Sequence, residues 1–168
     1  MYLQKMNLSK IYFNSSNGQQ LDIKSVVAEL TKFLKDDSGC FYKIIIGTDS
    51  KIGSDLQADF VTAVVVHRVG KGGRYFWRRI DPGKKFHTLR DRIWEEVIYS
   101  LEIAKNMFSE LQRITTSKYD FEVHVDIGTK GATKALIQEV TGMIRATQFS
   151  FKTKPDSYAA SSVADRHV

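Results

Sequence analysis

The sequence has very few of the residues on which several classes of protein depend. Cys40 is its only cysteine, so the chain can form neither an internal disulfide nor a cysteine-based zinc site. It has two prolines, Pro82 and Pro155, and no Pro/Ser-rich linker or internal repeat. No apolar run approaches the ~20 residues of a membrane span, and the polar residues throughout positions 1–10 do not make a secretory signal. We therefore expect a cytoplasmic protein that makes no contact with a membrane.

Length and composition indicate one folded domain with a surplus of positive charge. Hydrophobic residues make up 42% and charged residues 26% of the 168 positions, as is typical of a globular protein. The 25 lysines and arginines outnumber the 19 acids, which gives a formal net charge of +6. A surplus of this size favours a polyanionic partner such as nucleic acid. The sequence does not indicate the oligomeric state.

Hydrophobic periodicity and turn residues predict the order of the helices and strands. Residues 1–20 lack a regular pattern, and residues 1–39 form an N-terminal extension with one helix, from Asp22 to about Lys35. We expect strands at 42–46, 60–69, 74–80, 121–127 and 149–152, and helices at about 88–114, at about 133–146 and from about 157. Residues 40–168 would form the main domain, and the extension would pack with it as one globular unit.

The connections between these elements predict how the strands are arranged. Strands joined by short turns run antiparallel, whereas strands reached through helices run parallel to the first. The predicted class is therefore α/β, with a mixed five-stranded sheet of three antiparallel strands and then two parallel to the first. Helices would cover both faces of this sheet. The same order of elements is found in the ribonuclease H-like fold.

Two predicted strands each have an aspartate at the carboxyl end, Asp49 at the first and Asp126 at the fourth. If these strands are parallel neighbours, the two carboxylates lie side by side where open α/β sheets bind ligands. Close carboxylates repel each other, so they need a proton, hydrogen bonds or a metal, and Mg²⁺ prefers such oxygen ligands. The alternative is that each aspartate only ends a turn. The matching positions of the two favour a site.

The long helix supplies a third acid. Its apolar stripe consists of Leu89, Ile93, Val97, Leu101, Ala104, Phe108 and Leu111. Glu96 falls at the edge of this stripe, whereas Glu95 points away from it. An acid at the edge of a core is costly without a partner, so Glu96 is the better ligand and Glu95 the better surface residue. Alternatively, Glu96 pairs with Arg92 one turn earlier, and helix geometry alone does not separate these two interpretations.

The end of the chain offers a fourth acid, Asp165. The small residues at 159–162 allow a helix to approach another backbone closely, so we predict that residues 155–168 form an ordered helix against the sheet. Such a helix would bring Asp165 toward the metal, although an exposed acid near a frayed terminus is the usual alternative.

Other residues are candidates for supporting roles. His124 shares a strand face with Asp126, either as a partner of the ligands or as a hydrogen-bonded core histidine. Three lysines follow the fourth strand and would contact phosphates or be scattered solvated charge: Lys130, Lys134 and Lys154.

Four stretches of the chain closely resemble the bacterial YkuK family. They are residues 46–50, 87–93, 124–128 and 154–162, in the same order. That family is described as predicted ribonuclease H-like nucleases without a well-established function. The resemblance implies metal-dependent attack on phosphodiesters of RNA or DNA by two Mg²⁺ or Mn²⁺ ions, one activating water and the other stabilising the leaving oxygen. By position it implies four catalytic acids and metal ligands: Asp49, Glu96, Asp126 and Asp165. Asp91 and Glu95 are alternatives to Glu96.

Two other functions remain open. Residues 126–134 look like the phosphate loop of sugar kinases and actin-like ATPases, whose glycines and threonines cradle nucleotide phosphates. Those proteins carry the loop after their first strand and have two such domains, so this function ranks well below a nuclease. The third hypothesis is a non-catalytic nucleic-acid-binding or scaffold module, because a fold does not guarantee activity.

Overall fold

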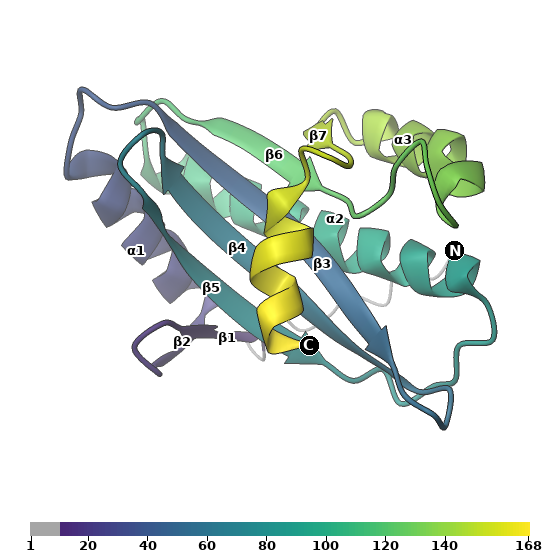
Figure 1. The fold of residues 1–168 in the computed structure, drawn as a ribbon. Helices are drawn as coiled ribbons and strands as arrows, with labels where there is room; N and C mark the ends of the chain where they lie inside the picture. Colours follow the sequence, from purple (N-terminus) through teal and green to yellow (C-terminus); the bar gives the residue numbers. More distant parts are fainter. Residues whose placement is uncertain (1–10) are drawn as a thin grey trace.

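The computed structural model describes residues 11–168. Their strands form one mixed sheet (Figure 1). The strands are β1 (Tyr12–Ser15), β2 (Gln20–Asp22), β3 (Tyr42–Ile52), β4 (Ala58–Arg68), β5 (Gly73–Ile80), β6 (Asp120–His124) and β7 (Ser150–Lys152). They lie in the order β2-β1-β5-β4-β3-β6-β7. The pairs β3/β6 and β6/β7 are parallel, and the other neighbours are antiparallel.

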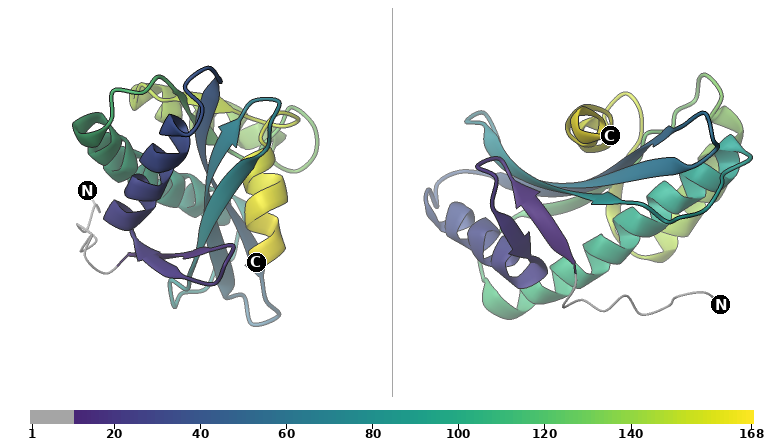
Figure 2. Two further views of the ribbon diagram at one scale, coloured as in Figure 1. Left: turned by 90° about the vertical axis from the view of Figure 1, so that its left-hand side faces the viewer. Right: turned by 90° about the horizontal axis from the view of Figure 1, so that it is seen from below.

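The helices lie on both faces of this sheet, as the sequence predicts. They are α1 (Ile23–Lys35), α2 (Leu89–Ile114) and α3 (Ile137–Ala146), with a 3-10 turn at Lys134–Leu136 before α3. The chain ends in a π-helix, Ala159–Ala164, and a 3-10 turn, Asp165–His167, which together we call the C-terminal helix. Helices α1, α2 and α3 share the main hydrophobic core on one face. The C-terminal helix lies alone across the concave face (Figure 2).

Local signals set the starts of the first two helices. The side chain of Asp22 accepts a hydrogen bond from the Ser25 N–H at 2.8 Å, and Thr88 accepts one from the Asp91 N–H at 3.0 Å. Each bond satisfies an N–H at the helix end that has no partner within the helix. Both starts confirm the predictions. No helix in residues 11–168 is long and apolar enough to cross a membrane.

The prediction of a five-stranded sheet is wrong, because the sheet has seven strands. The two additional strands, β1 and β2, form a hairpin within the segment that we expected to be irregular, and β1 pairs with the outer edge of β5. Phe13 is fully buried and Ile11 is 1% exposed, so alternate side chains of this segment enter the core. The pattern is only a few residues long, which is too short to separate a strand from a loop. The predictions for positions 1–10 lie outside the described residues.

β3 is also longer than predicted. We expected it to end at Ile46, but it continues to Ile52 because β4 pairs with it over its full length, from Tyr42↔Arg68 to Ile52↔Ala58. β6, on the other side, pairs with it only as far as Gly47. Asp49 therefore lies within a strand, at a point where one edge of that strand has lost its partner.

The C-terminal helix packs against the sheet, as predicted from its small residues. Ala159 is fully buried against Ile45 and Val65, and Ala164 is fully buried against the neighbouring part of β4. A larger side chain at either position would separate the helix from the strands beneath it. The contact carries the end of the chain across β3 and β4, toward Asp49.

Replacing Ala159 by leucine is expected to destabilise the protein by about 1–3 kcal/mol, because three additional carbons must fit a site without free volume. Urea unfolding measures this loss. Ser162 is exposed on the same helix, and Ser162→Leu should change the free energy of unfolding by less than about 0.5 kcal/mol. An equal loss in both variants would contradict the observed packing.

Candidate functional site

The register of the parallel strands places Asp49 and Asp126 at the same level of the sheet. β3 and β6 pair from Lys43↔Asp120 to Gly47↔His124, and each aspartate lies two residues beyond the last pair. The side chain of Ser50 bonds to Glu96 on the α2 face, so alternation turns Asp49 toward the face of the C-terminal helix.

The electrostatics of Asp49 show that other acids lie nearby. Burial is the main reason why its pKa rises from 3.8 to about 6. The negative charges of Asp126 and Asp165 raise it further, while the Ser50 backbone N–H and the Arg92 guanidinium oppose the rise. Three carboxylates from three separate segments of the chain therefore interact at this end of the sheet.

Glu96 approaches the same region from α2. It is 2% exposed, and it accepts a hydrogen bond from the Ser50 hydroxyl. The guanidinium of Arg92 donates to the Ser50 backbone oxygen and hydroxyl at 2.8 Å each, and its Nη1 lies 3.9 Å from the Glu96 carboxylate. Glu96 is thus buried, as its place at the edge of the stripe predicted, and it also pairs with Arg92, as the alternative interpretation expected. Sequence reasoning missed Ser50, although a polar residue one position after Asp49 must face α2.

Burial raises the pKa of Glu96 to about 8, and the charges of Asp49 and Asp126 add to the rise. The Ser50 hydroxyl and Arg92 act in the opposite direction. Glu96 is therefore coupled to the aspartates, although it comes from the opposite face of the sheet.

The other two acids of the α2 N-terminal half have different surroundings. Asp91 is exposed and interacts with Thr88 at the helix start. Glu95 is less solvated than predicted: its side chain is 18% exposed, it accepts a hydrogen bond from Tyr99 and it pairs with Lys84, each at 3.0 Å. The reason is that the aromatic cluster around Tyr99 covers the second flank of the helix. Neither acid is among the charges that shift the pKa of Asp49 or Glu96.

Asp126 has one occupied and one free carboxylate oxygen. Its Oδ2 lies 3.0 Å from the Nζ of Lys154. Its Oδ1 is buried and has no hydrogen-bond partner within the described part of the chain. A buried oxygen without a partner is costly, so this atom is a site where a proton or a cation would be stabilised.

Asp165 is exposed on the last turn of the C-terminal helix. Its charge contributes to the raised pKa of Asp49, so the helix does bring it near the other acids. Asp165 therefore lies on an ordered helix, as predicted, and its side chain is exposed, as the alternative expected.

The oxygen atoms of the four candidate acids suit a hard divalent cation, but in this structure the side chains are not arranged around a common point. Within residues 11–168 no three His, Cys, Asp or Glu side chains are grouped closely enough to hold an ion. Glu96 is turned to Ser50, and Lys154 occupies one oxygen of Asp126. All four acids offer oxygen ligands, which Mg²⁺ and Mn²⁺ accept, and the free Oδ1 of Asp126 fits such an ion.

His124 belongs to a buried hydrogen-bonded chain. Its Nε2 lies 3.1 Å from the Glu122 carboxylate, which also pairs with Lys43 at 3.0 Å. Its Nδ1 accepts a hydrogen bond from the Ala159 N–H at 3.3 Å. Burial lowers the pKa of His124, so the ring is neutral with its proton on Nε2. His124 thus joins the sheet to the start of the C-terminal helix, and sequence reasoning missed its partners Glu122 and Lys43.

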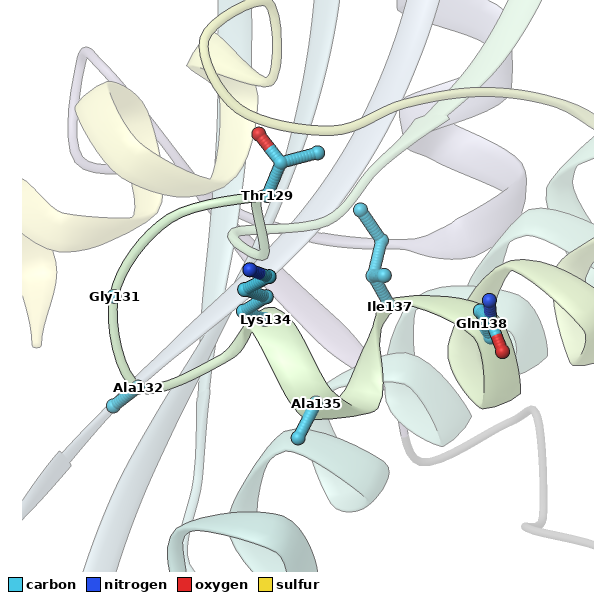
Figure 3. Close-up of a pocket in the computed structure, with 7 residues that line it drawn as sticks. All are labelled: Thr129, Gly131, Ala132, Lys134, Ala135, Ile137 and Gln138. Atoms are coloured by element: carbon cyan, nitrogen blue, oxygen red, sulfur yellow. The ribbon is translucent and has the colours of Figure 1, made fainter.

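The loop after β6 forms a shallow pocket of about 550 Å³ (Figure 3). Its lining includes Thr129, Gly131 and Lys134, together with the apolar side chains of Ala132, Ala135 and Ile137. Lys130 and Lys134 are both exposed. Of the three lysines named from the sequence, Lys154 is the one that the structure pairs with a candidate ligand.

The raised pKa values predict how stability depends on pH in the metal-free protein. Asp49 and Glu96 keep their protons in the folded state to about pH 6 and about pH 8, whereas their ordinary pKa values are 3.8 and 4.5. The folded state binds more protons over this interval, so the stability that these groups contribute is lost as the pH rises. Asp49→Asn should therefore be more stable than the wild type at pH 8, by a margin that shrinks toward pH 4.

Thermal unfolding at several pH values in the presence of EDTA tests this dependence. Asp91→Asn serves as the control, because that acid is exposed at the start of α2 and is not among the charges that shift the pKa of Asp49. A constant difference between Asp49→Asn and wild type from pH 4 to pH 8 would contradict the raised pKa of Asp49.

The chain matches the family described as Ribonuclease H-like over residues 25–168, from within α1 to the last residue. It therefore belongs to the ribonuclease H-like family. It is 38% identical over 168 residues to the uncharacterized protein YkuK of Bacillus subtilis (strain 168), an alignment that covers 94% of this chain and 96% of that protein. The resemblance to the YkuK family is thereby confirmed. No solved structure gives a significant match.

Proposed function

We propose that the protein is a divalent-metal-dependent nuclease, with Asp49, Glu96, Asp126 and Asp165 as ligands of Mg²⁺ or Mn²⁺. The observation that carries this proposal is the approach of four acids from four separate segments to one end of the sheet. Burial raises the pKa values of Asp49 and Glu96, and the charges of neighbouring acids add to both rises. Such repulsion destabilises a metal-free fold unless protons or cations relieve it. Membership of the ribonuclease H-like family supports a nucleic-acid-related function at this place.

Bound divalent ions would supply a water nucleophile at neutral pH and positive charge for the leaving oxygen of a phosphodiester. The side chains of the protein would hold the ions and orient their ligands. Asp126 offers its free Oδ1, while Ser50 and Arg92 hold Glu96 in a fixed orientation beneath the sheet end. Asp165, being exposed, would close the site from the solvent side.

The substrate would be RNA or DNA. The net charge of +6 favours a polyanion, and the exposed Lys130 and Lys134 follow β6 on the chain segment just beyond Asp126. Lysine binds phosphate as a point charge and reads no sequence by itself. These residues therefore support phosphate contact without selecting between the two nucleic acids.

A nuclease assay with labelled RNA and DNA, in Mg²⁺, Mn²⁺ or EDTA, tests the proposal. Wild type should cleave only with a divalent ion, and Asp49→Asn should lose this activity. Asp59→Asn, an exposed acid on the neighbouring strand, should retain it. Nucleic-acid binding without cleavage would instead support a non-catalytic module, and metal-dependent binding of ATP would support the phosphate-loop alternative.

A further inference from the structure

Lys154 is a cation that contacts one of the four candidate acids, Asp126. Its Nζ lies 3.0 Å from the Oδ2 of Asp126. The Asp126 side chain is 21% exposed, whereas that of Lys154 is 52% exposed. The lysine thus reaches a mostly buried carboxylate from the solvent side and neutralises part of the negative charge.

The backbone fixes Lys154 in this place. Beyond the end of β7, the Lys154 N–H donates to the Ile127 carbonyl at 2.8 Å, so the segments that follow β6 and β7 stay side by side. A Cβ atom at Gly128 would lie 3.1 Å from the Cβ of Lys154 and within 4 Å of its Cγ and Cδ. The stem of the lysine therefore runs over Gly128, where a glycine leaves room for it.

We infer that Lys154 is the counter-ion of the metal-free site, which leaves Asp126 when a divalent cation binds and then contacts a phosphate oxygen of the nucleic acid. The inference rests on the proposed function. An ion on the free Oδ1 and the Lys154 ammonium on Oδ2 would share one carboxylate, and the two cations repel each other at such short range. The lysine stem is long and flexible, and its ammonium is a common phosphate ligand.

This role predicts opposite effects of one substitution. Lys154→Met keeps the stem over Gly128 but removes the competing charge, so Mn²⁺ should bind more tightly. The same variant lacks the phosphate contact, so the metal-loaded protein should bind an oligonucleotide more weakly. A lysine that only stabilised the fold would not produce both changes.

Calorimetric titration with Mn²⁺ measures the first effect. Breaking a partly exposed ion pair should tighten binding by about two- to fivefold. The matched control is Lys152→Met, which removes the same charge two residues away. The charge of Lys152 lowers the pKa of His124, so this lysine lies near His124 and makes no ion pair with Asp126. This control should change Mn²⁺ affinity by less than half as much as Lys154→Met does.

Fluorescence anisotropy with a labelled oligonucleotide, as DNA and as RNA, measures the second effect in Ca²⁺ and in EDTA. In Ca²⁺, Lys154→Met should weaken binding by about tenfold, as expected for one lost charged hydrogen bond. In EDTA the change should be less than about twofold, because the lysine is then held by Asp126.

Equal Mn²⁺ affinities of wild type and Lys154→Met would overturn the inference and leave the proposed function intact. An equal loss of oligonucleotide binding with and without the ion would also overturn it, since the lysine would then contact phosphate permanently. If neither the wild type nor the two variants bound Mn²⁺, the proposed function itself would fail, and the inference with it.

Discussion

Asp126→Asn should reduce metal-dependent cleavage by more than about 100-fold, since even the partners of metal ligands are worth about 10- to 100-fold. The variant keeps the shape of the side chain and removes its charge. It therefore abolishes the ion pair with Lys154 and leaves the buried Oδ1 position with an amide in place of a carboxylate. The loss should appear in the cleavage rate at saturating Mg²⁺ and in the affinity for Mn²⁺.

The matched control is Asp156→Asn, an exposed acid in the turn just after Lys154. It should cleave at nearly the wild-type rate. Thermal unfolding of both variants separates a lost ligand from a lost fold. An Asp126→Asn protein that is folded and retains half of the wild-type rate would remove Asp126 from the catalytic site.

The second large effect is expected at α2, where Glu96→Gln should lower cleavage by about 100-fold and Glu95→Gln by less than about threefold. Glutamine in place of Glu96 can still accept the Ser50 hydrogen bond, so the fold around it is kept. What it loses is a carboxylate coupled to Asp49 and Asp126. Glu95 lies on the other flank of the helix and contacts Tyr99 and Lys84.

Because the two glutamates are neighbours in sequence and are changed identically, each is the control for the other. Cleavage rates with both metals, normalised to the folded fraction, provide the comparison. The reverse ranking would show that the metal approaches α2 from the flank of Glu95, and that the buried Glu96 only stabilises the helix.

The main elements of the fold followed from periodicity because long segments repeat their pattern several times. The stripe of α2, from Leu89 to Leu111, spans about six turns, and it correctly placed Glu96 at the buried edge. The hairpin β1–β2 was missed because its few residues hold too little pattern. The end of β3 was misplaced because the pairing with β4, which extends the strand to Ile52, is a tertiary interaction that no local signal at Gly47 reveals.

The candidate site likewise has features that local patterns predict and features that only tertiary contacts determine. Asp49 and Asp126 could be paired from the sequence, since both lie at the carboxyl ends of apolar runs that were predicted to be neighbouring parallel strands, and the register confirms that they lie at the same level. The network around His124 could not, because Lys43, Glu122 and Ala159 come from three separate segments of the chain. One signal was available: Glu122, His124 and Asp126 alternate with apolar residues along the predicted strand 121–127, which predicts that all three share a face. Nothing local indicated that Lys154 would lie on Asp126.

A crystal structure of the protein grown with Mn²⁺, with the ion located by anomalous scattering, tests the central claim most directly. We predict an ion between Asp49 and Asp126 that is bound by a carboxylate oxygen of each, with the Lys154 ammonium moved away from Asp126. The four acids would then be closer together than in the metal-free fold. Absence of an anomalous peak at this end of the sheet, with Lys154 still paired to Asp126 in saturating Mn²⁺, would contradict the proposed metal site.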